Sequence, residues 1–192
     1  MLSENQSSQH SDQPLQTFTR CLAQYRARVY ETYTMEENNR FGKMKPHAYG
    51  QVAESKPTIL VIEDNVDQWF LIRWALLQRF SDAEIVWLSE ANRVMPYLES
   101  CLQREQDLPR VMLVDLYLPK AEEGVNVLQR VKAHPICQRI PAVMLSWSND
   151  AEDIANAFNH SADAYLVKPG NYRDWLSNLS SLDVYWNRSR PV

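Results

Sequence analysis

The chain has few glycines, few cysteines and no long apolar run, and each scarcity excludes a class of protein. Only 4 of its 192 residues are glycine, too few for a glycine-rich loop that cradles phosphates. Its 3 cysteines, Cys21, Cys101 and Cys137, lie far apart without the spacing of a zinc site, which favours a reducing compartment. No stretch approaches the ~20 apolar residues of a membrane span, and no signal peptide opens the chain. We therefore expect a cytoplasmic protein.

Positive charge is not in excess either. Lys and Arg total 20 against 24 Asp and Glu, so the formal net charge is -4. This balance offers no overall positive field to a nucleic-acid backbone or an anionic membrane, and we expect neither as a partner. What is present is ordinary for a globular chain: 45% of the residues are hydrophobic and 23% are charged. The length suits one domain with an extension.

The pattern along the chain separates an N-terminal extension from a main domain. Residues 1–12 are rich in Ser, Gln and Asn and are predicted to be disordered. Within 13–35, apolar residues recur at spacings of three and four, which predicts an amphipathic helix that either packs on the main domain or mediates a homodimer. Residues 36–57 lack periodicity and are predicted to be a linker. The main domain is expected over 58–187, followed by a tail at 188–192.

Short continuous apolar runs alternate with segments that can form helices throughout the main domain. Such runs are typical of strands buried on both faces. They cover residues 58–62, 84–88, 111–114, 142–146 and 164–167. Their alternation with helices predicts an α/β fold, a five-stranded parallel doubly wound sheet of the flavodoxin-like (βα)5 type with an N-terminal helical extension.

Two of the predicted helices carry specific expectations about burial. In the helix after the first strand, the residues predicted to face inward are Leu71, Ile72, Ala75 and Leu76. The apolar residues left off that stripe are Trp69, Phe70, Trp74 and Leu77. Large exposed apolar patches are uncommon, so we expect the helix of 13–35 to cover them. In the fourth helix, the predicted inward stripe is Ala151, Ile154, Ala155 and Phe158.

Polar residues stand where the predicted strands end. Glu63 and Asp64 follow the first strand, Asp115 and Ser146 close the third and fourth, and Lys168 follows the fifth. The carboxyl ends of parallel strands meet at one edge of the sheet, so these side chains are expected to lie together. Three carboxylates at one place call for a cation, and oxygen ligands suit Mg²⁺. With a lysine and a hydroxyl beside it, Asp115 is placed to act as a nucleophile in phosphoryl transfer.

Five stretches in this order, VIEDN, VMLVDLYLP, Gly124, PAVMLS and DAYLVKPG, resemble the receiver domain of two-component response regulators over residues 57–186. The resemblance implies that Asp115 accepts a phosphoryl group from a phosphohistidine on a histidine kinase or a histidine phosphotransfer protein. It implies Mg²⁺ ligation by Asp64, Asp115 and the backbone carbonyl of Tyr117, with Glu63 acting through water. It assigns no enzymatic activity beyond self-phosphotransfer and autodephosphorylation.

The resemblance also implies a switch. Lys168 would pair with the phosphoryl oxygens, and its bond to Pro169 would be cis. Ser146 would donate its hydroxyl to the phosphoryl group, and Tyr165 would rotate into the space that Ser146 vacates. The surface of the fourth helix, fifth strand and fifth helix would then contact a downstream protein. Too few residues follow the last predicted helix for an output domain, which suggests a stand-alone regulator, most similar to those paired with phytochrome-type kinases.

Two residues depart from the family pattern, and two alternatives stay open. Trp147 stands where the family has a small residue, which predicts restricted access for phosphodonors and slow phosphorylation. Tyr117 is positioned to obstruct the water that hydrolyses the acyl phosphate. One alternative is a pseudo-receiver that binds partners without phosphorylation. The other is a phosphatase of the haloacid dehalogenase type, which needs a second Asp at the position of Tyr117.

Overall fold

The computed structural model describes residues 56–187 and contains the predicted five-stranded sheet. The strands are β1 (Thr58–Ile62), β2 (Glu84–Leu88), β3 (Val111–Asp115), β4 (Ala142–Ser146) and β5 (Ala164–Val167). All neighbouring strands pair in parallel, in the order β2-β1-β3-β4-β5. The strand order reverses between β1 and β3, and in such sheets this switch point marks the place of the ligand site.

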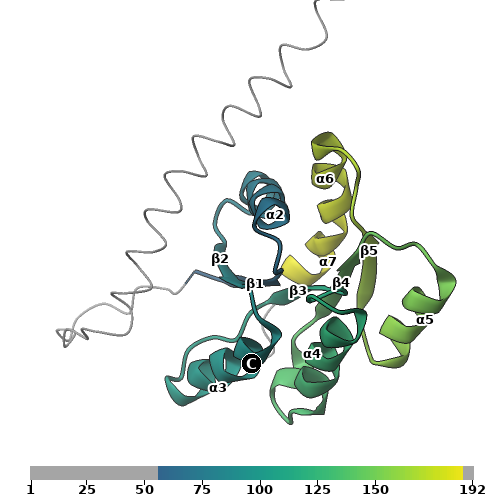
Figure 1. Ribbon diagram of the computed structural model, residues 1–192. Coiled ribbons are helices and arrows are strands. Elements are labelled where there is room, and N and C mark those ends of the chain that lie inside the picture. The colour runs from purple at the N-terminus through teal and green to yellow at the C-terminus, as the bar shows by residue number, and fades with distance from the viewer. Residues whose placement is uncertain (1–55, 188–192) are drawn as a thin grey trace, which may run out of the picture. The chain divides into compact units, whose positions relative to one another are not determined.

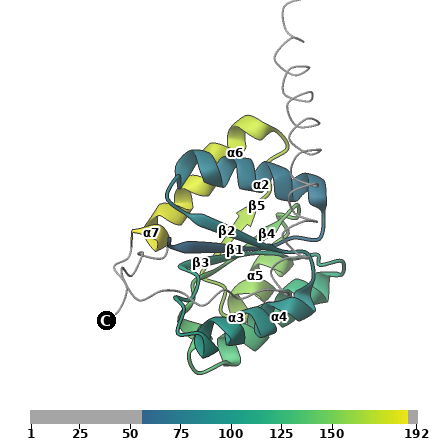
Figure 2. The same ribbon diagram turned by 90° about the vertical axis from the view of Figure 1, so that its left-hand side faces the viewer.

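Helices cover both faces of the sheet, so the predicted doubly wound fold class is confirmed. The helices are α2 (Val66–Arg79), α3 (Val94–Gln103), α4 (Ala121–Ala133), α5 (Ala151–Asn159), α6 (Tyr172–Asn178) and α7 (Asp183–Trp186). Short 3-10 turns lie at η1 (Ala91–Arg93), η2 (Cys137–Arg139) and η3 (Leu179–Leu182). Helices α2 and α6 lie on one face, and α3, α4 and α5 lie on the other (Figures 1 and 2). Among the described helices, none has the length and apolar character needed to cross a membrane.

The predicted segments 1–12 and 13–35, nearly all of the linker and the tail at 188–192 lie outside the described residues. The disordered N-terminus, the amphipathic helix and its two possible roles, docking in cis or dimerisation, therefore stay predictions. The boundaries assigned to the main domain stay predictions as well.

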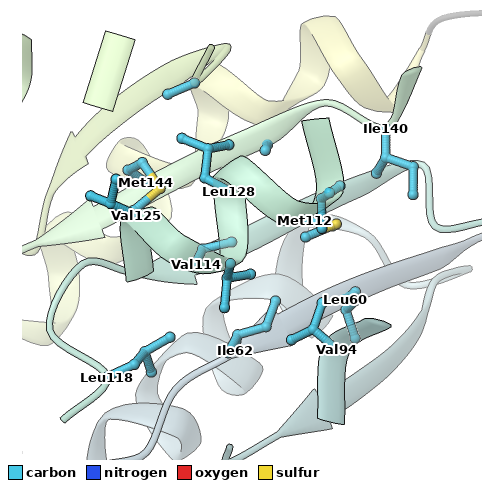
Figure 3. Packing of buried hydrophobic residues seen from close by; sticks show 14 of the residues in the cluster. Leu60, Ile62, Val94, Met112, Val114, Leu118, Val125, Leu128, Ile140 and Met144 are labelled. Carbon is cyan, nitrogen blue, oxygen red and sulfur yellow. The ribbon is translucent and has the colours of Figure 1, made fainter. Parts of the chain in front are cut away.

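A large apolar cluster between the sheet and helices α3 and α4 forms much of the core (Figure 3). Strands β1 and β3 supply every second residue to it, as a period of two requires when both faces are buried. The strand residues of the cluster are Leu60, Ile62, Met112, Val114, Ala142 and Met144, and they pack against helix residues that include Leu98 and Leu128. The central strands are thereby held rigidly, and so are the side chains at their carboxyl ends.

The prediction that Trp69 and Phe70 lie off the inward face of α2 is wrong. Their exposed fractions are 2% and 5%. Trp69 stacks on Trp87 of the edge strand β2, with ring centroids 5.2 Å apart and an interplanar angle of 9°. Both side chains are thus buried, and the ring that covers Trp69 is the Trp87 indole of β2 and not a residue of the predicted N-terminal helix.

The predicted inward stripe of α5 is also largely wrong. Ala151 and Ala155 are exposed, and the exposed fraction of Phe158 is 49%, whereas Ala157 is buried. The covered face runs through Ile154 and Ala157, three residues apart, instead of through Ile154 and Phe158, four apart. This helix packs over β5, an edge strand with a single neighbour, so it has less apolar surface to cover than α4 has.

Candidate functional site

The carboxylates predicted to meet at the strand ends do meet. Oxygen atoms of Glu63, Asp64 and Asp115 all lie within 4.8 Å of one another. Glu63 and Asp64 follow β1, and Asp115 closes β3, the two strands on either side of the switch point. Glu63 and Asp115 are buried, whereas Asp64 is exposed to solvent.

The turn between β1 and α2 holds the side chain of Glu63. Asn65 is the N-cap of α2, and its side-chain oxygen accepts from the backbone N–H groups of Asp67 and Gln68 at 3.0 and 3.1 Å. The backbone N–H of Asn65 donates to Glu63 Oε1 at 3.2 Å. The Trp87 indole N–H donates to the backbone carbonyl of Glu63 at 2.7 Å. Capping, strand pairing and aromatic packing therefore all determine where this carboxylate points.

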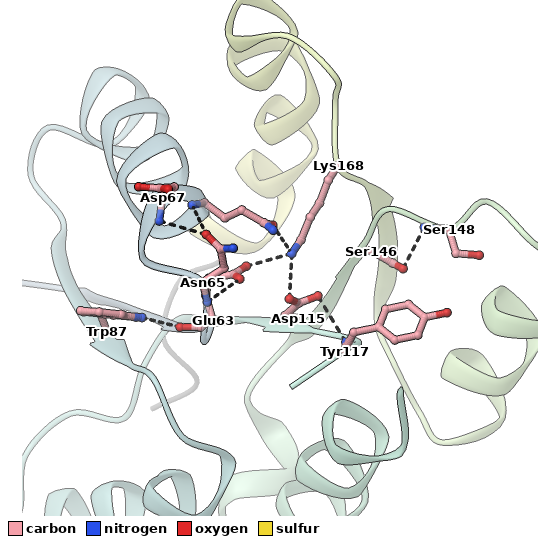
Figure 4. A network of polar contacts seen from close by, with 10 residues as sticks. Glu63, Asn65, Asp67, Trp87, Asp115, Tyr117, Ser146, Ser148 and Lys168 are labelled. Carbon is pink, nitrogen blue, oxygen red and sulfur yellow. Dashed lines mark hydrogen bonds and ion pairs between the residues drawn. The ribbon is translucent and has the colours of Figure 1, made fainter. Parts of the chain in front are cut away.

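Lys168 joins the carboxylates at the centre of the cluster, as Figure 4 shows. Its Nζ lies 2.8 Å from Asp115 Oδ2 and 2.9 Å from Glu63 Oε2. The backbone N–H of Lys168 donates to the carbonyl of Ser146 at 2.6 Å, which extends the pairing of β4 with β5 up to the lysine. A buried lysine is stable only when it is paired, and here two carboxylates supply the opposite charge.

The prediction of a cis bond between Lys168 and Pro169 is wrong: the described part of the chain contains no cis peptide bond. An X–Pro bond favours trans by about 0.5 to 1 kcal/mol, so the cis form requires a compensating gain. In this structure the trans chain already brings the ammonium of Lys168 to Asp115.

The electrostatics of the cluster favour binding of a divalent cation. Burial and the neighbouring charge of Asp115 raise the pKa of Glu63 from 4.5 to about 7, although Lys168 acts in the opposite direction. With all groups ionised, three carboxylates and one ammonium leave two negative charges uncompensated. Oxygen donors in this number and charge fit a hard cation such as Mg²⁺ or Mn²⁺.

Asp115 has a different contact at each of its two carboxylate oxygens. Oδ2 pairs with Lys168, and Oδ1 accepts from the backbone N–H of Tyr117 at 3.3 Å. The side chain of Tyr117 is exposed, and its hydroxyl donates to Asp153 Oδ2 on α5 at 3.0 Å. That hydrogen bond to Asp153 is the main cause that raises the pKa of Tyr117. The ring of Tyr117 therefore reaches from the β3–α4 loop to α5, and its predicted role toward water stays a prediction.

The other predicted residues lie around this centre. Ser146 is buried, and its Oγ accepts from the backbone N–H of Ser148 at 3.0 Å. The hydroxyl of Tyr165 donates to the carbonyl of Ser148 at 2.9 Å, so both predicted switch residues contact the same loop. Trp147 lies between Ser146 and Ser148 in the chain and is 53% exposed. The switch roles and the predicted effect of Trp147 on access stay predictions.

Gly124, one of the residues that carried the resemblance, is required by close packing. A Cβ at this position would lie 2.2 Å from the carbonyl oxygen of Asp115 and 2.5 Å from that of Leu116. Helix α4 therefore approaches the end of β3 so closely that no side chain fits between them.

Gln68 is a contact residue of this site that sequence analysis missed. Its Oε1 lies 2.5 Å from the Nζ of Lys168, although the two residues are 100 positions apart in the chain. The sequence offered one signal, the spacing Asn65-x-x-Gln68, but this spacing predicts a capping box in which the glutamine folds back onto its own helix.

Comparison with known proteins agrees with this geometry. The sequence model of the family described as "Response regulator receiver domain" matches residues 59–180 of this chain. The probable methanogenesis regulatory protein FilR2 of Methanothrix harundinacea is 32% identical over 140 residues, covering 71% of this chain and 90% of FilR2. The response regulator Rcp1 of Synechocystis is 29% identical over 136 residues, covering 69% of this chain and 92% of Rcp1.

Solved structures show the same similarity. The Mn²⁺-bound form of Rcp1 superimposes with a TM-score of 0.60 and 27% identity, over 71% of this chain and 99% of that one. The phosphorylated cyanobacterial phytochrome response regulator RcpA superimposes with a TM-score of 0.59 and 28% identity, over 69% of this chain and 94% of that one. The chain thus belongs to the response regulator receiver domain family of two-component signalling and carries that family's phosphorylatable aspartate site.

Proposed function

We propose that the protein is a phosphorelay response regulator in which Asp115 accepts a phosphoryl group from a phosphohistidine. The observation that carries the proposal is the ion cluster in which Lys168 contacts both Asp115 and Glu63. In the transfer, one carboxylate oxygen of Asp115 forms the new O–P bond while the N–P bond breaks. The imidazole nitrogen leaves with the electron pair. The donor would be a histidine kinase or a histidine phosphotransfer protein.

The donor set fits Mg²⁺ as the cofactor. Asp64, Asp115 and the backbone carbonyl of Tyr117 would hold the cation, with Glu63 acting through water. When bound, Mg²⁺ supplies neutralisation of the charge that develops on the transferring phosphoryl oxygens. The Mn²⁺-bound structure of Rcp1 supports a divalent cation in a protein of this fold.

The remaining residues act on the phosphoryl group through charge and hydrogen bonding. Lys168, already within ion-pair distance of Asp115, would pair with a phosphoryl oxygen as soon as the transfer occurs. Ser146 accepts a hydrogen bond from Ser148 and so keeps its own hydroxyl proton to donate to a second phosphoryl oxygen. Tyr165 would rotate toward the space that Ser146 leaves, which requires breaking its bond to the carbonyl of Ser148.

Output would proceed through protein contact on α5, β5 and α6. This part of the surface exposes Phe158, Val167 and Leu176, with exposed fractions of 49%, 38% and 37%. Contiguous apolar patches mark sites of protein interaction, and we propose that these three side chains contribute to one. A downstream protein would bind there according to the phosphorylation state of Asp115. The regulator itself would have no enzymatic activity beyond self-phosphotransfer and autodephosphorylation. The similarity to RcpA, described as a phytochrome response regulator, supports a phytochrome-type kinase as the donor. We also propose that the protein is cytoplasmic, as expected of a receiver domain.

The proposal is tested by labelling the full chain with radioactive acetyl phosphate and with a phosphorylated histidine kinase, with Mg²⁺ or with EDTA. We expect a label that is lost in EDTA, is removed by hydroxylamine as an acyl phosphate is, and is absent in Asp115→Asn. Asp82→Asn, an exposed aspartate in the α2–β2 turn, is the matched control and should label like the wild type. A wild-type chain that takes no label from either donor would contradict the proposal and favour the pseudo-receiver alternative.

A further inference from the structure

The ammonium of Lys168 has three N–H groups, and the structure provides an acceptor for each. Two are the carboxylates of Asp115 and Glu63, at 2.8 and 2.9 Å. The third is the amide oxygen of Gln68, at 2.5 Å, the shortest of the three distances. The side chain of Lys168 has no exposed surface, so water does not replace a missing acceptor there.

Gln68 reaches Lys168 because its usual partner is already occupied. A glutamine three residues after an N-cap normally accepts from the backbone N–H of that N-cap residue. Here the N–H of Asn65 donates to Glu63 Oε1 instead, at 3.2 Å. The backbone N–H of Gln68 is in turn fixed by the side chain of Asn65 at 3.1 Å. The amide is thereby directed across the turn toward the end of β5.

The charge of this third acceptor matters as much as its position. Glu63, Asp64 and Asp115 already bring three carboxylates to within 4.8 Å of one another. A fourth carboxylate would compete with the phosphoryl group for the lysine and would add repulsion to the cluster. An amide oxygen accepts a hydrogen bond from the N–H without adding a charge. The net charge of the cluster therefore stays at the value that suits a divalent cation and a phosphoryl group.

We propose that Gln68 is a positioning residue for phosphoryl transfer: its neutral amide holds the Lys168 ammonium within hydrogen-bond distance of the Asp115 carboxylate. The inference rests on the proposed function. When an oxygen of Asp115 becomes bonded to phosphorus, the carboxylate loses its negative charge. One N–H of Lys168 then donates its hydrogen bond to a phosphoryl oxygen in place of Asp115. Gln68 and Glu63 continue to accept from the other two N–H groups, so the ammonium changes one acceptor while two hydrogen bonds hold it in place. Figure 4 shows the contacts with Glu63 and Asp115.

The test compares Gln68→Met, which keeps the length of the side chain but has no amide oxygen, with Gln68→Glu, which keeps an acceptor. Gln78→Met, an exposed position on the same helix, is the matched control. The rate of acetyl-phosphate labelling is measured across a range of Mg²⁺ concentrations. A hydrogen bond to a charged group corresponds to about a tenfold change in rate. We expect Gln68→Met to lower the rate at saturating Mg²⁺ by about tenfold, with an unchanged half-saturating Mg²⁺ concentration.

The two other variants separate positioning from structural support. Gln68→Glu should recover only part of the rate, because its carboxylate still accepts the N–H of Lys168 but competes with the phosphoryl group for it. It should also lower the half-saturating Mg²⁺ concentration, because it adds a negative charge beside the cation. Gln78→Met should behave like the wild type. Equal saturating rates for Gln68→Met and the wild type would overturn the inference and leave the proposed function intact.

A second measurement does not depend on phosphorylation. A hydrogen-bonded, buried lysine ammonium exchanges its protons slowly and gives a resolved ¹H–¹⁵N signal in lysine-selective NMR spectra. We expect the Lys168 signal in the wild type and its loss or displacement in Gln68→Met, with the signal in Gln78→Met unchanged. An unchanged Lys168 signal in Gln68→Met would refute the positioning role. A wild type that shows this signal but accepts no label would refute the proposed function instead.

Discussion

Gly124 lies in the first turn of α4, where replacement by alanine has two opposite effects on stability. Alanine favours a helix over glycine by about 1 kcal/mol, so Gly124→Ala would stabilise the fold if the position had room. The new Cβ would instead lie 2.2 Å from the carbonyl oxygen of Asp115 and 2.5 Å from that of Leu116. Both atoms are backbone, and the N–H of Leu116 is bonded to the carbonyl of Leu145 at 2.8 Å, which limits how far this segment shifts.

The clash should outweigh the gain in helix propensity. Overpacking a rigid site costs about 1–3 kcal/mol, and contacts with two backbone oxygens place this case at the upper end. Subtracting the propensity gain of about 1 kcal/mol leaves a net loss of about 2 kcal/mol for Gly124→Ala. Because the displaced atoms belong to Asp115 and its neighbour, labelling by acetyl phosphate should fall together with stability.

The assay is urea unfolding followed by tryptophan fluorescence, with acetyl-phosphate labelling on the same samples. Gly170→Ala is the matched control, because a Cβ at that position meets no atom within 4 Å. Its free energy of unfolding should stay within about 0.5 kcal/mol of the wild type. If Gly124→Ala is as stable as the wild type or more stable, the close packing of α4 on β3 that we describe is incorrect.

Three further predictions concern the buried site and the tryptophans. Because the folded-state pKa of Glu63 is raised from 4.5 to about 7, the metal-free protein should lose stability as pH rises between these values, by at most about 3 kcal/mol. Unfolding in EDTA at pH 5 and pH 8 should show this loss in the wild type relative to Glu63→Gln, and a difference that does not vary with pH would contradict it. Trp69→Ala should cost about 3–5 kcal/mol of unfolding free energy, measured in urea, because its ring is stacked on Trp87; a loss under 1 kcal/mol would refute that packing. Trp147→Ala should leave stability within about 0.5 kcal/mol but label faster with acetyl phosphate, whereas equal labelling rates would remove the predicted restriction of access.

Much of the site was predictable because its residues are adjacent to strands. Continuous apolar runs of four or five residues identify strands buried on both faces, and parallel strands place their carboxyl ends together. Glu63, Asp64, Asp115 and Lys168 follow or close such runs, so their meeting at one edge follows from the order of elements alone. The structure adds that Asn65 is the N-cap of α2, which fixes the start of that helix next to this edge.

The sequence by itself thus determined the order of strands and helices along the chain and the set of charges at one edge of the sheet, because both depend on short-range pattern. Only the tertiary structure decided which helix faces are buried. Periodicity describes one helix, but the burial of Trp69 depends on Trp87 in another element, and the exposure of Phe158 depends on the narrow edge of the sheet. The contact of Gln68 with Lys168 joins residues 100 positions apart, and no local pattern carries such a distance.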